Sequence, residues 1–441
     1  MNIKSYKYTK GVDLPKVNPY NERSEVVTLG APAIIAVPVK QFKGSEAVIM
    51  VEEGERVEVG SVLAKGRTCT IYSPSAGTVL GFEKRPSVYG GSCLHIIIER
   101  VESNVVKRLP ELDMEQLTPE IIIKRIFDAG IVNNDGVPLY QKLILKDEDK
   151  PVELVVNGAT DELFMSTNVT LLNSLPVEII SGAIYLANCI RVAKIKIVVT
   201  EGQEKKLAPF MDTLKEYDGE FSIELATVSD KYPVGDEREI VVALTGGKEI
   251  GGGKSAMQYG MAVVDLACCY SVFEAISEGV QDTRRLITIL GVGDGGKESV
   301  NAWVMVGTPL DFILNAFRPN DVGSVRKIVA GGLMRGVAVA GLESATTKTL
   351  KGIVFINEAE ATELPELDCI GCGRCANVCP RHLLPRQIEE YVIDEDFVAC
   401  KKFGAEYCTR CGACGFICPS RRRLVQRIVF GAQTIKDKGV K

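Results

Sequence analysis

A cysteine pattern that occurs twice near the C-terminus constrains this 441-residue chain more than any other feature. Each copy has the spacing C-x2-C-x2-C-x3-C-P. The first copy consists of Cys369, Cys372, Cys375, Cys379 and Pro380, and the second of Cys408, Cys411, Cys414, Cys418 and Pro419. Nine of the 14 cysteines lie between Cys369 and Cys418. The thiols are therefore gathered in one segment and are not spread as in a disulfide-stabilised scaffold.

This spacing predicts two [4Fe–4S] clusters, because three thiolates two residues apart can contact one face of a cubane. The glycines between them let the backbone turn tightly, and the fourth cysteine of each copy ligates the other cluster. The predicted ligands of the first cluster are Cys369, Cys372, Cys375 and Cys418. Those of the second cluster are Cys408, Cys411, Cys414 and Cys379.

A pair of structural zinc sites is the alternative for these cysteines. A zinc ribbon uses two C-x2-C pairs for each ion and needs neither a third cysteine in the run nor the proline. Two full copies of the pattern favour iron–sulfur clusters. Cys400 lies outside both copies and is expected to be a structural thiol.

Basic residues crowd the same segment. They are Arg374, Arg381, Lys401, Lys402, Arg410, Arg421, Arg422 and Arg423. Cations stabilise the reduced state of an anionic cluster, and they can also steer an acidic carrier such as ferredoxin. The alternative, a solvated basic face without a partner, is favoured for charge runs in general.

Length and composition set outer limits on the function. A chain of this length predicts two to four domains. The formal net charge of −5 gives no reason to expect nucleic acid as a partner. We find no apolar run of 18 residues and no secretory signal at the N-terminus, which predicts a cytoplasmic protein. Contact with a membrane is expected only indirectly, through a complex at its inner face.

Four domains are predicted along the chain, in a multidomain α/β plus β fold. Residues 30–105 show short strands between turns and resemble a lipoyl-type barrel-sandwich domain, although no lysine stands at the hairpin tip near residues 66–70. Residues 118–280 alternate helices and strands as in a parallel α/β sheet, with helices expected over 119–129 and 171–186. Residues 284–345 are expected to form a β-grasp (SLBB-like) module, and residues 360–430 the ferredoxin-like cluster domain.

The order of these four domains resembles the C subunit of the Rnf ferredoxin–NAD oxidoreductase complex. The strings SPSAGTV, PEIIIKRIFDAGIV, VVNGA, KYPVGDEREIVVALTG and CIGCGRCANVCPRHLLP support the resemblance over nearly the full length. It implies an α/β domain similar to the flavin-bearing subunit of respiratory NADH dehydrogenases, which binds FMN and NADH. It also implies an electron-transfer protein that uses two [4Fe–4S] clusters.

The flavin-binding strings of that family are only partly present. The Gly-rich phosphate loop is replaced by residues 131–138, which keep one glycine and add Asp135, a side chain that would repel a phosphate. Residues 265–269 also depart from the family string. The candidate contacts that remain for FMN or NADH are Asn157, Gly158 and Glu162.

Three functions therefore stay open. The favoured one is a protein that receives electrons from a partner and passes them through the clusters. The second is an FMN-dependent NADH oxidoreductase, and the third is a structural adaptor of a reductase complex. We expect no acid–base catalytic residue, since the only histidines are His95 and His382.

Divergent relatives of this family accompany amino-acid reductases of fermenting anaerobes, notably D-proline reductase. The resemblance therefore implies ferredoxin or D-proline reductase as candidate partners. Cys69, near the hairpin tip of the first domain, and the adjacent pair Cys268 and Cys269 are candidate redox thiols. Structural roles are the favoured interpretation for all three.

Overall fold

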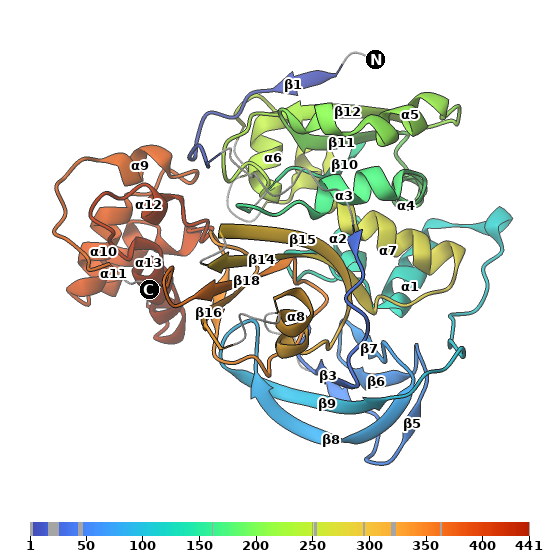
Figure 1. Cartoon of the computed structure of the whole chain (residues 1–441). Coiled ribbons are helices and arrows are strands. Elements are labelled where there is room, and N and C mark those ends of the chain that lie inside the picture. Colours follow the sequence, from blue (N-terminus) through green and yellow to red (C-terminus); the bar gives the residue numbers. More distant parts are fainter. Residues whose placement is uncertain are drawn as a thin grey trace.

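Four structural units follow one another along the chain in the computed structural model (Figure 1). The structure describes residues 3–15, 26–42, 47–160, 162–248, 250, 254–293, 296–318, 323–361 and 364–440. The cysteine-rich unit lies at one side of the molecule, and the other three pack together beside it.

The first unit is a sandwich of two small antiparallel sheets, which confirms the predicted barrel-sandwich fold. One sheet has the order β3 (Ile34–Pro38), β9 (Ser92–Arg100), β8 (Gly77–Pro86) and β5 (Arg56–Val57). The other contains β4 (Val48–Ile49), β6 (Val62–Lys65) and β7 (Thr70–Tyr72). Alternate residues such as Ile35, Ile71 and Ile96 point into one shared core, where each buried aliphatic side chain contributes about 1.5–3 kcal/mol.

The second unit is built on a fully parallel sheet with helices on both faces. Its strands have the order β1 (Lys4–Tyr6), β12 (Ser222–Val228), β11 (Lys194–Thr200), β10 (Glu153–Asn157) and β13 (Met261–Asp265). Leu154 and Val156 of β10 pack with α1 (Pro119–Ala129), α4 (Pro176–Cys189) and α7 (Leu266–Ser277). Val155 faces the opposite side, towards α6 (Glu237–Leu244). The three-residue edge strand β1 was not expected from the sequence.

The single helix expected over residues 171–186 is wrong. The structure has two helices, α3 (Thr167–Ser174) and α4, that meet at Leu175. Proline has no N–H to donate and clashes with the preceding turn, so Pro176 can begin α4 but cannot continue α3. Among the described residues, no single helix is long and apolar enough to cross a membrane, and this pair, which passes that test together, is bent by 99°.

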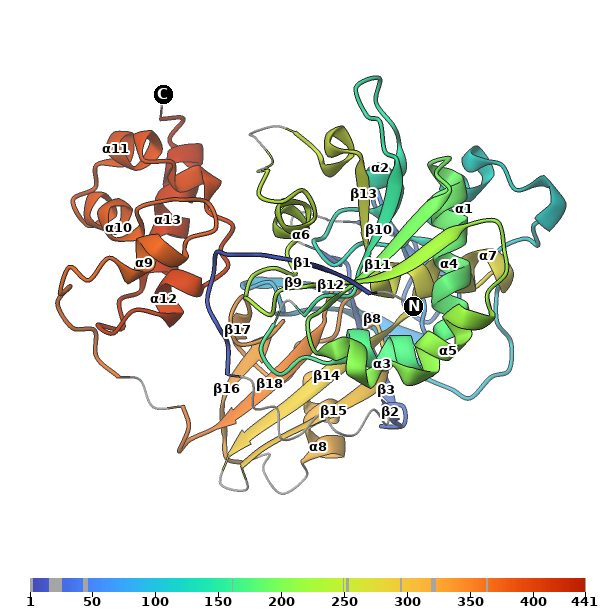
Figure 2. The ribbon, with the colours of Figure 1, turned by 90° about the horizontal axis from the view of Figure 1, so that it is seen from above.

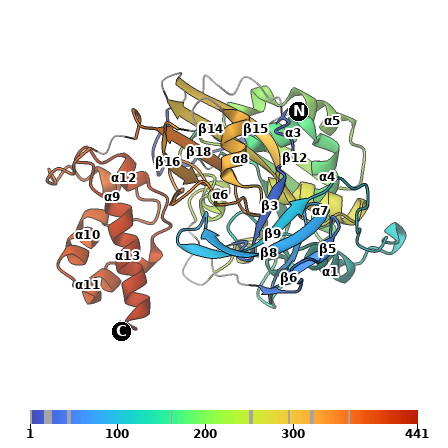
Figure 3. The ribbon, with the colours of Figure 1, turned by 60° about the horizontal axis from the view of Figure 1, so that its bottom comes forward.

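The third unit is a mixed sheet with one helix, α8 (Leu310–Phe317), on its face. The strand order is β17 (Val337–Val339), β16 (Val325–Ala330), β18 (Gly352–Asn357), β14 (Arg284–Gly293), β15 (Gly296–Met305) and β2 (Val26–Val27). The central pair β14 and β18 is parallel, as in a β-grasp fold. Strand β18 lies beyond residue 345, where the module was expected to end. Figure 3 shows this sheet above the curved strands β8 and β9.

The cysteine-rich unit is helical outside its cysteine loops. Its helices are α9 (Arg374–Val378), α10 (Pro385–Ile393), α11 (Phe397–Lys402), α12 (Ala413–Phe416) and α13 (Leu424–Asp437). Cys400 is fully buried in their core, as expected of a structural thiol. The equally buried Glu389 is paired with Arg427 and, at 2.7 Å, with Arg422. A buried carboxylate needs such partners, so this pairing ties α10 to α13.

The N-terminal segment connects the cysteine-rich unit to the parallel sheet. Figure 2 shows it running from β1 past α6 towards the cysteine-rich helices. The N–H of Gly11 donates to the carbonyl of Val378 at 3.2 Å, and the N–H of Val12 donates to the carbonyl of Tyr232 at 2.8 Å. Chain segments far apart in sequence therefore form this junction.

Candidate functional site: two cysteine cavities and an acidic cavity

One of the two cysteine sets lines an open cavity of about 240 Å³. Its thiols belong to Cys369, Cys372, Cys375 and Cys418. The first two side chains are exposed to solvent. Gly371 and Gly373 adopt positive φ angles of 68° and 71°, which let the loop curl around the opening.

The other set lines a smaller and deeper cavity. Its thiols belong to Cys379, Cys408, Cys411 and Cys414. Three of them, Cys379, Cys411 and Cys414, are buried. Backbone N–H groups point at sulfur here: Leu383 donates to Cys379 Sγ and Arg410 to Cys408 Sγ, both at 3.4 Å. Such donors stabilise the thiolate charge of a cluster ligand.

The structure therefore brings together the two crossed sets expected from the spacing. Cys418 joins the first three cysteines of the first copy, and Cys379 joins the first three of the second. Within the described ranges, no three His, Cys, Asp or Glu side chains are placed to hold a single metal ion. Four thiols around a cavity form a donor set that fits a [4Fe–4S] cluster, and the ligand assignment remains a prediction.

Several of the nearby cations already have partners within the protein. Arg381 pairs with Glu239 of α6 at 3.4 Å, and Arg422 pairs with Glu389. The Lys401 ammonium donates to the carbonyl of Val440. Part of the basic character of this segment is therefore used inside the molecule, while Arg374 lines the open cavity.

A third cavity, of about 290 Å³, lies at the carboxyl edge of the parallel sheet, where ligands bind in folds of this class. Asn157 and Asp265 end the neighbouring strands β10 and β13 there, and Arg335 and Lys351 of the β-grasp unit close the other side. This cavity is the place where the sequence predicts contacts to FMN or NADH.

Two of the three predicted flavin contacts, Asn157 and Glu162, line this cavity and Gly158 does not, and all three are engaged by the protein itself. The Asn157 amide donates to the carbonyl of Gly235 at 2.8 Å and accepts the N–H of Ala159 at 3.2 Å. The Glu162 carboxylate accepts the N–H groups of Met334 and Arg335, at 2.9 and 2.6 Å. Gly158 packs so closely that an added Cβ would lie 3.0 Å from Leu266.

The loop over 131–138 is held by a carboxylate. Asp265 Oδ2 accepts the N–H of Asn134 at 2.7 Å, and Asn133 Oδ1 accepts the N–H of Asp265 at 3.0 Å. Burial, and to a lesser degree the charge of Asp135, raise the pKa of Asp265 above its usual value, and the charges of Lys351 and Lys142 and the N–H of Asn134 limit that rise. An anion of the protein thus binds the loop that would hold a phosphate in a flavin-binding relative.

Asp135, which was expected to repel a phosphate, is paired with Lys142 at 2.7 Å. The same ammonium also pairs with Glu237. Burial alone would lower the pKa of Lys142, but these two carboxylates outweigh burial and hold the pKa above its usual value. The lysine therefore stays charged and neutralises part of the acidic wall.

Four charged lining residues were not expected from the sequence: Asp236, Glu237, Arg335 and Lys351. The first two lie in the string KYPVGDEREIVVALTG, which supported the family resemblance but drew no attention as a site. The two basic residues come from the β-grasp unit, and no local pattern connects that unit with the parallel sheet.

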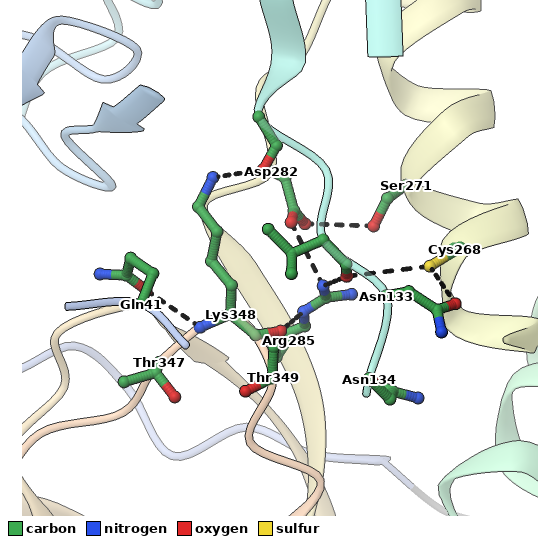
Figure 4. Close-up of polar contacts among 12 residues, drawn as sticks. Gln41, Asn133, Asn134, Cys268, Ser271, Asp282, Arg285, Thr347, Lys348 and Thr349 are labelled. Atoms are coloured by element: carbon green, nitrogen blue, oxygen red, sulfur yellow. Dashed lines mark hydrogen bonds and ion pairs between the residues drawn. The ribbon is translucent and has the colours of Figure 1, made fainter. Parts of the chain in front are cut away.

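All three candidate redox thiols are buried, and Figure 4 shows Cys268 in a buried polar network beside Asn133 of the loop. Cys268 Sγ is 3.5 Å from Asn133 Oδ1, and Cys69 Sγ is 3.6 Å from the carbonyl oxygen of Gly130. Burial raises the thiol pKa values of Cys69, Cys268 and Cys269, which disfavours the reactive thiolate. These positions favour the structural interpretation.

A short chain of contacts joins the acidic cavity to the deeper cysteine set. The Arg335 guanidinium donates to Asp236 at 3.0 Å and to the Tyr232 hydroxyl at 3.1 Å. That hydroxyl donates in turn to the carbonyl of Cys411. Ala413 packs beside it. The deeper set therefore faces the rest of the molecule, and the open set faces solvent.

Three family models match consecutive parts of the chain. Residues 6–103 match the RnfC barrel sandwich hybrid domain, residues 126–274 the Nuo51 FMN-binding domain, and residues 368–421 the 4Fe-4S dicluster domain. A solved NAD+-reducing [NiFe]-hydrogenase shares the fold with a TM-score of 0.50 and 14% identity, over 73% of this chain and 63% of that one.

Curated proteins similar to this chain include C subunits of the ion-translocating oxidoreductase complex. The one from Vibrio cholerae serotype O1 is 28% identical over 87% of this chain and 50% of its own length. The one from Actinobacillus succinogenes is 27% identical over 89% of this chain and 56% of its own length. The chain spans about half the length of the curated relatives it matches. In sequence, domain content and domain order, the chain is similar to the C subunit of the Rnf complex.

Proposed function

We propose that this chain transfers electrons between protein partners through two [4Fe–4S] clusters held by the two crossed cysteine sets. The single observation that carries the proposal is the arrangement of eight thiols around two cavities in the pattern expected for a dicluster domain. When bound, such clusters supply one-electron transfer. The protein supplies the thiolates and the N–H donors to sulfur, and it buries one site more deeply than the other.

The two cysteine sets have different surroundings, which supports a path for electrons between the body of the protein and the surface. The deeper set is joined to the body of the protein through Tyr232 and Arg335. The open set is bordered by solvent and by the exposed apolar side chains of Ile370 and Leu384. Ile370 stands between two of the predicted ligands and is 71% exposed. We propose that an electron-transfer protein docks on this face.

The nature of that partner is part of the proposal. The relatives are named as members of an ion-translocating oxidoreductase complex, so the partner in a complex would be a neighbouring electron-transfer protein. A ferredoxin and a D-proline reductase are the candidates that the sequence resemblance adds. Contact with the inner face of a membrane would then come through the complex.

A flavin-dependent NADH oxidoreductase is the second candidate function. The Nuo51 FMN-binding model, which matches residues 126–274, favours it. The cavity itself does not fit a flavin phosphate, because Asp265 already holds the loop N–H at that place. We therefore propose electron entry from a protein partner, without a role for FMN.

Iron analysis of protein purified without oxygen tests the cluster assignment. We expect about eight irons and eight sulfides per chain, and about half of each in Cys372→Ser and in Cys411→Ser. The two variants should lose different paramagnetic resonance signals after reduction, because they change different clusters. Zinc in place of iron, or full iron in both variants, would contradict the proposal.

A docking experiment tests the partner face separately. Ile370→Asp places a charge beside the open cysteine set, and we expect electron exchange with a reduced ferredoxin to slow at least tenfold while the iron content stays unchanged. The matched control is Val398→Asp on α11, a residue 64% exposed that does not line the cysteine cavity. Equal rates in the two variants would place docking elsewhere.

A further inference from the structure

The carboxyl end of β13 is where this fold offers a phosphate its best binding site. The 12-residue helix α7 begins there at Leu266, and the loop over 131–138 faces its first turn. Free N–H groups at a helix N-terminus and in an adjoining loop attract anions through their dipoles. A phosphorylated ligand of the acidic cavity would place its phosphate at this corner.

Asp265 already occupies that corner with a negative charge. It is the N-cap residue of α7, yet its side chain makes no capping bond to the helix and lies across to the loop. There it accepts the N–H of Asn134 at 2.7 Å. The Asp265 carboxylate therefore takes the loop donor that a phosphate oxygen would need.

The loop cannot readily turn towards another anion, because buried groups hold it from behind. The backbone N–H of Asp265 donates to Asn133 Oδ1 at 3.0 Å, and Cys268 Sγ lies 3.5 Å from the same oxygen. The Arg285 guanidinium donates to the carbonyl of Val132 at 2.8 Å. Figure 4 shows these side chains converging on the loop from α7 and β14.

The rest of the cavity wall adds to the negative charge. Besides Asp265 it contains four carboxylates, those of Asp135, Glu162, Asp236 and Glu237. Three basic groups face these five carboxylates: Arg335 pairs with Asp236 at 3.0 Å, Lys142 pairs with Asp135 and Glu237, and Lys351 lies near Asp265 itself. A doubly charged phosphate entering here would meet repulsion that these pairs do not remove.

We propose that Asp265 acts as a built-in anion which makes this cavity reject phosphorylated ligands, so that it accepts an uncharged or cationic small molecule instead. Asp265 is thus a specificity-determining residue of a site whose fold is shared with FMN-binding domains. The proposal concerns the cavity alone and does not depend on the cysteine ligands. It can fail while the proposed electron transfer stands.

Titration of the full-length, cluster-loaded protein with FMN and riboflavin tests the proposal, since these two probes differ only by the phosphate. Flavin fluorescence quenching should give wild-type protein an affinity for FMN no higher than that for riboflavin. Asp265→Asn keeps the size of the side chain and an oxygen acceptor while removing the charge. We expect it to raise FMN affinity at least tenfold and to change riboflavin affinity less than twofold.

Glu237→Gln is the matched control, because it removes a carboxylate of the same cavity that does not touch the loop N–H. It should leave the ratio of the two flavin affinities within twofold of wild type. Iron content and circular dichroism should be equal in all three proteins. A wild-type protein that carries FMN when purified, or an unchanged ratio in Asp265→Asn, would overturn the proposal.

Inorganic phosphate provides a second probe in case neither flavin ring enters the cavity. Phosphate should raise the thermal unfolding midpoint of Asp265→Asn and leave wild type and Glu237→Gln unchanged, because only the first variant removes the negative charge that lies against the loop N–H. Without stabilisation of Asp265→Asn by phosphate, and without flavin binding, the proposal would be refuted.

Discussion

At the scale of single residues, His95 shows how burial can dominate the charge state of a side chain. The side chain is fully buried in β9, its Nδ1 lies 3.0 Å from the carbonyl oxygen of Cys93, and its Nε2 has no hydrogen-bond partner among the described residues. Burial lowers the pKa of His95 to about 4, well below the value of about 6.5 in an unfolded chain. The folded protein therefore holds this imidazole neutral across a pH range in which the unfolded chain protonates it.

His95 should make the protein less stable in mild acid. A folded pKa below the unfolded value means that stability is complete above about pH 6.5 and falls as the pH drops towards 4. Between pH 8 and pH 5.5 the loss through this residue is about 1.4 kcal/mol, from the two pKa values. Urea unfolding of wild type and His95→Gln at both pH values measures it. Equal pH dependence in the two proteins would show that His95 has no such role.

Residue patterns in the sequence predicted the site only where one chain segment contains it. The two cysteine sets could be assigned because the spacing itself encodes the cubane geometry. Asp265, Arg335 and Lys351 could not be found as a group, because Asp265 lies on the parallel-sheet unit and the two basic residues lie on the β-grasp unit, so they meet only in the folded chain. Nor does a single histidine such as His95 reveal its burial in a sequence.

At the scale of helices and strands, the packing of α4 on α7 depends on one glycine. An added Cβ at Gly182 would lie 1.8 Å from the carbonyl oxygen of Cys269, a backbone atom that cannot rotate away. Both helices belong to the main core of the α/β unit. The two helices must therefore separate to accept any side chain at this position.

Gly182→Ala should destabilise the protein by roughly 2 kcal/mol, although alanine favours helices by about 1 kcal/mol over glycine. Overpacking outweighs propensity here because the clash involves backbone. Ser181→Ala, the neighbouring position on the same helix, is the matched control and should be neutral or slightly stabilising. Thermal and urea unfolding compare the stabilities of the two variants. Equal stability would mean that α4 and α7 can move apart without a loss of free energy.

Helices and strands with a clear pattern in their own residues were predicted from the sequence. Short strands that form only by pairing with a longer strand were not. Helix α1 was expected at its observed bounds from the helical spacing of its apolar residues, and in the structure Pro119 begins it and Gly130, with a φ of 68°, ends it. The edge strands β1 and β2 contain three and two residues, too few to show a period. They are strands only because β12 and β15 offer them open edges.

At the scale of the whole molecule, the N-terminal segment and the Tyr232 region hold the cysteine-rich unit against the body. This junction uses contacts between residues more than 170 positions apart, such as Tyr232 with Cys411. The order of the units could be predicted from sequence strings, but this junction could not, because no pattern records which surfaces meet. Its consequence is that one cysteine set is covered by the body and the other is left open.

That asymmetry predicts two rates of iron loss. A chelator reaches the open set directly, whereas Cys379, Cys411 and Cys414 are each less than 10% exposed and require local opening of the unit. Under an iron chelator without oxygen, we expect about half the iron to leave at least tenfold faster than the rest. Absorbance of the iron–chelator complex follows both phases.

Variants assign each phase to one set of thiols. Cys372→Ser should abolish the fast phase and keep the slow one, while Cys411→Ser should do the reverse, because each removes a ligand from only one of the crossed sets.

Tyr232→Phe removes the hydroxyl that contacts Cys411, so it should speed the slow phase and leave the fast phase unchanged. A single phase in wild type would mean that the body does not shield the deeper set. If Tyr232→Phe also speeds the loss of iron from the open set, the junction supports the cysteine-rich unit as a whole and not the deeper site alone.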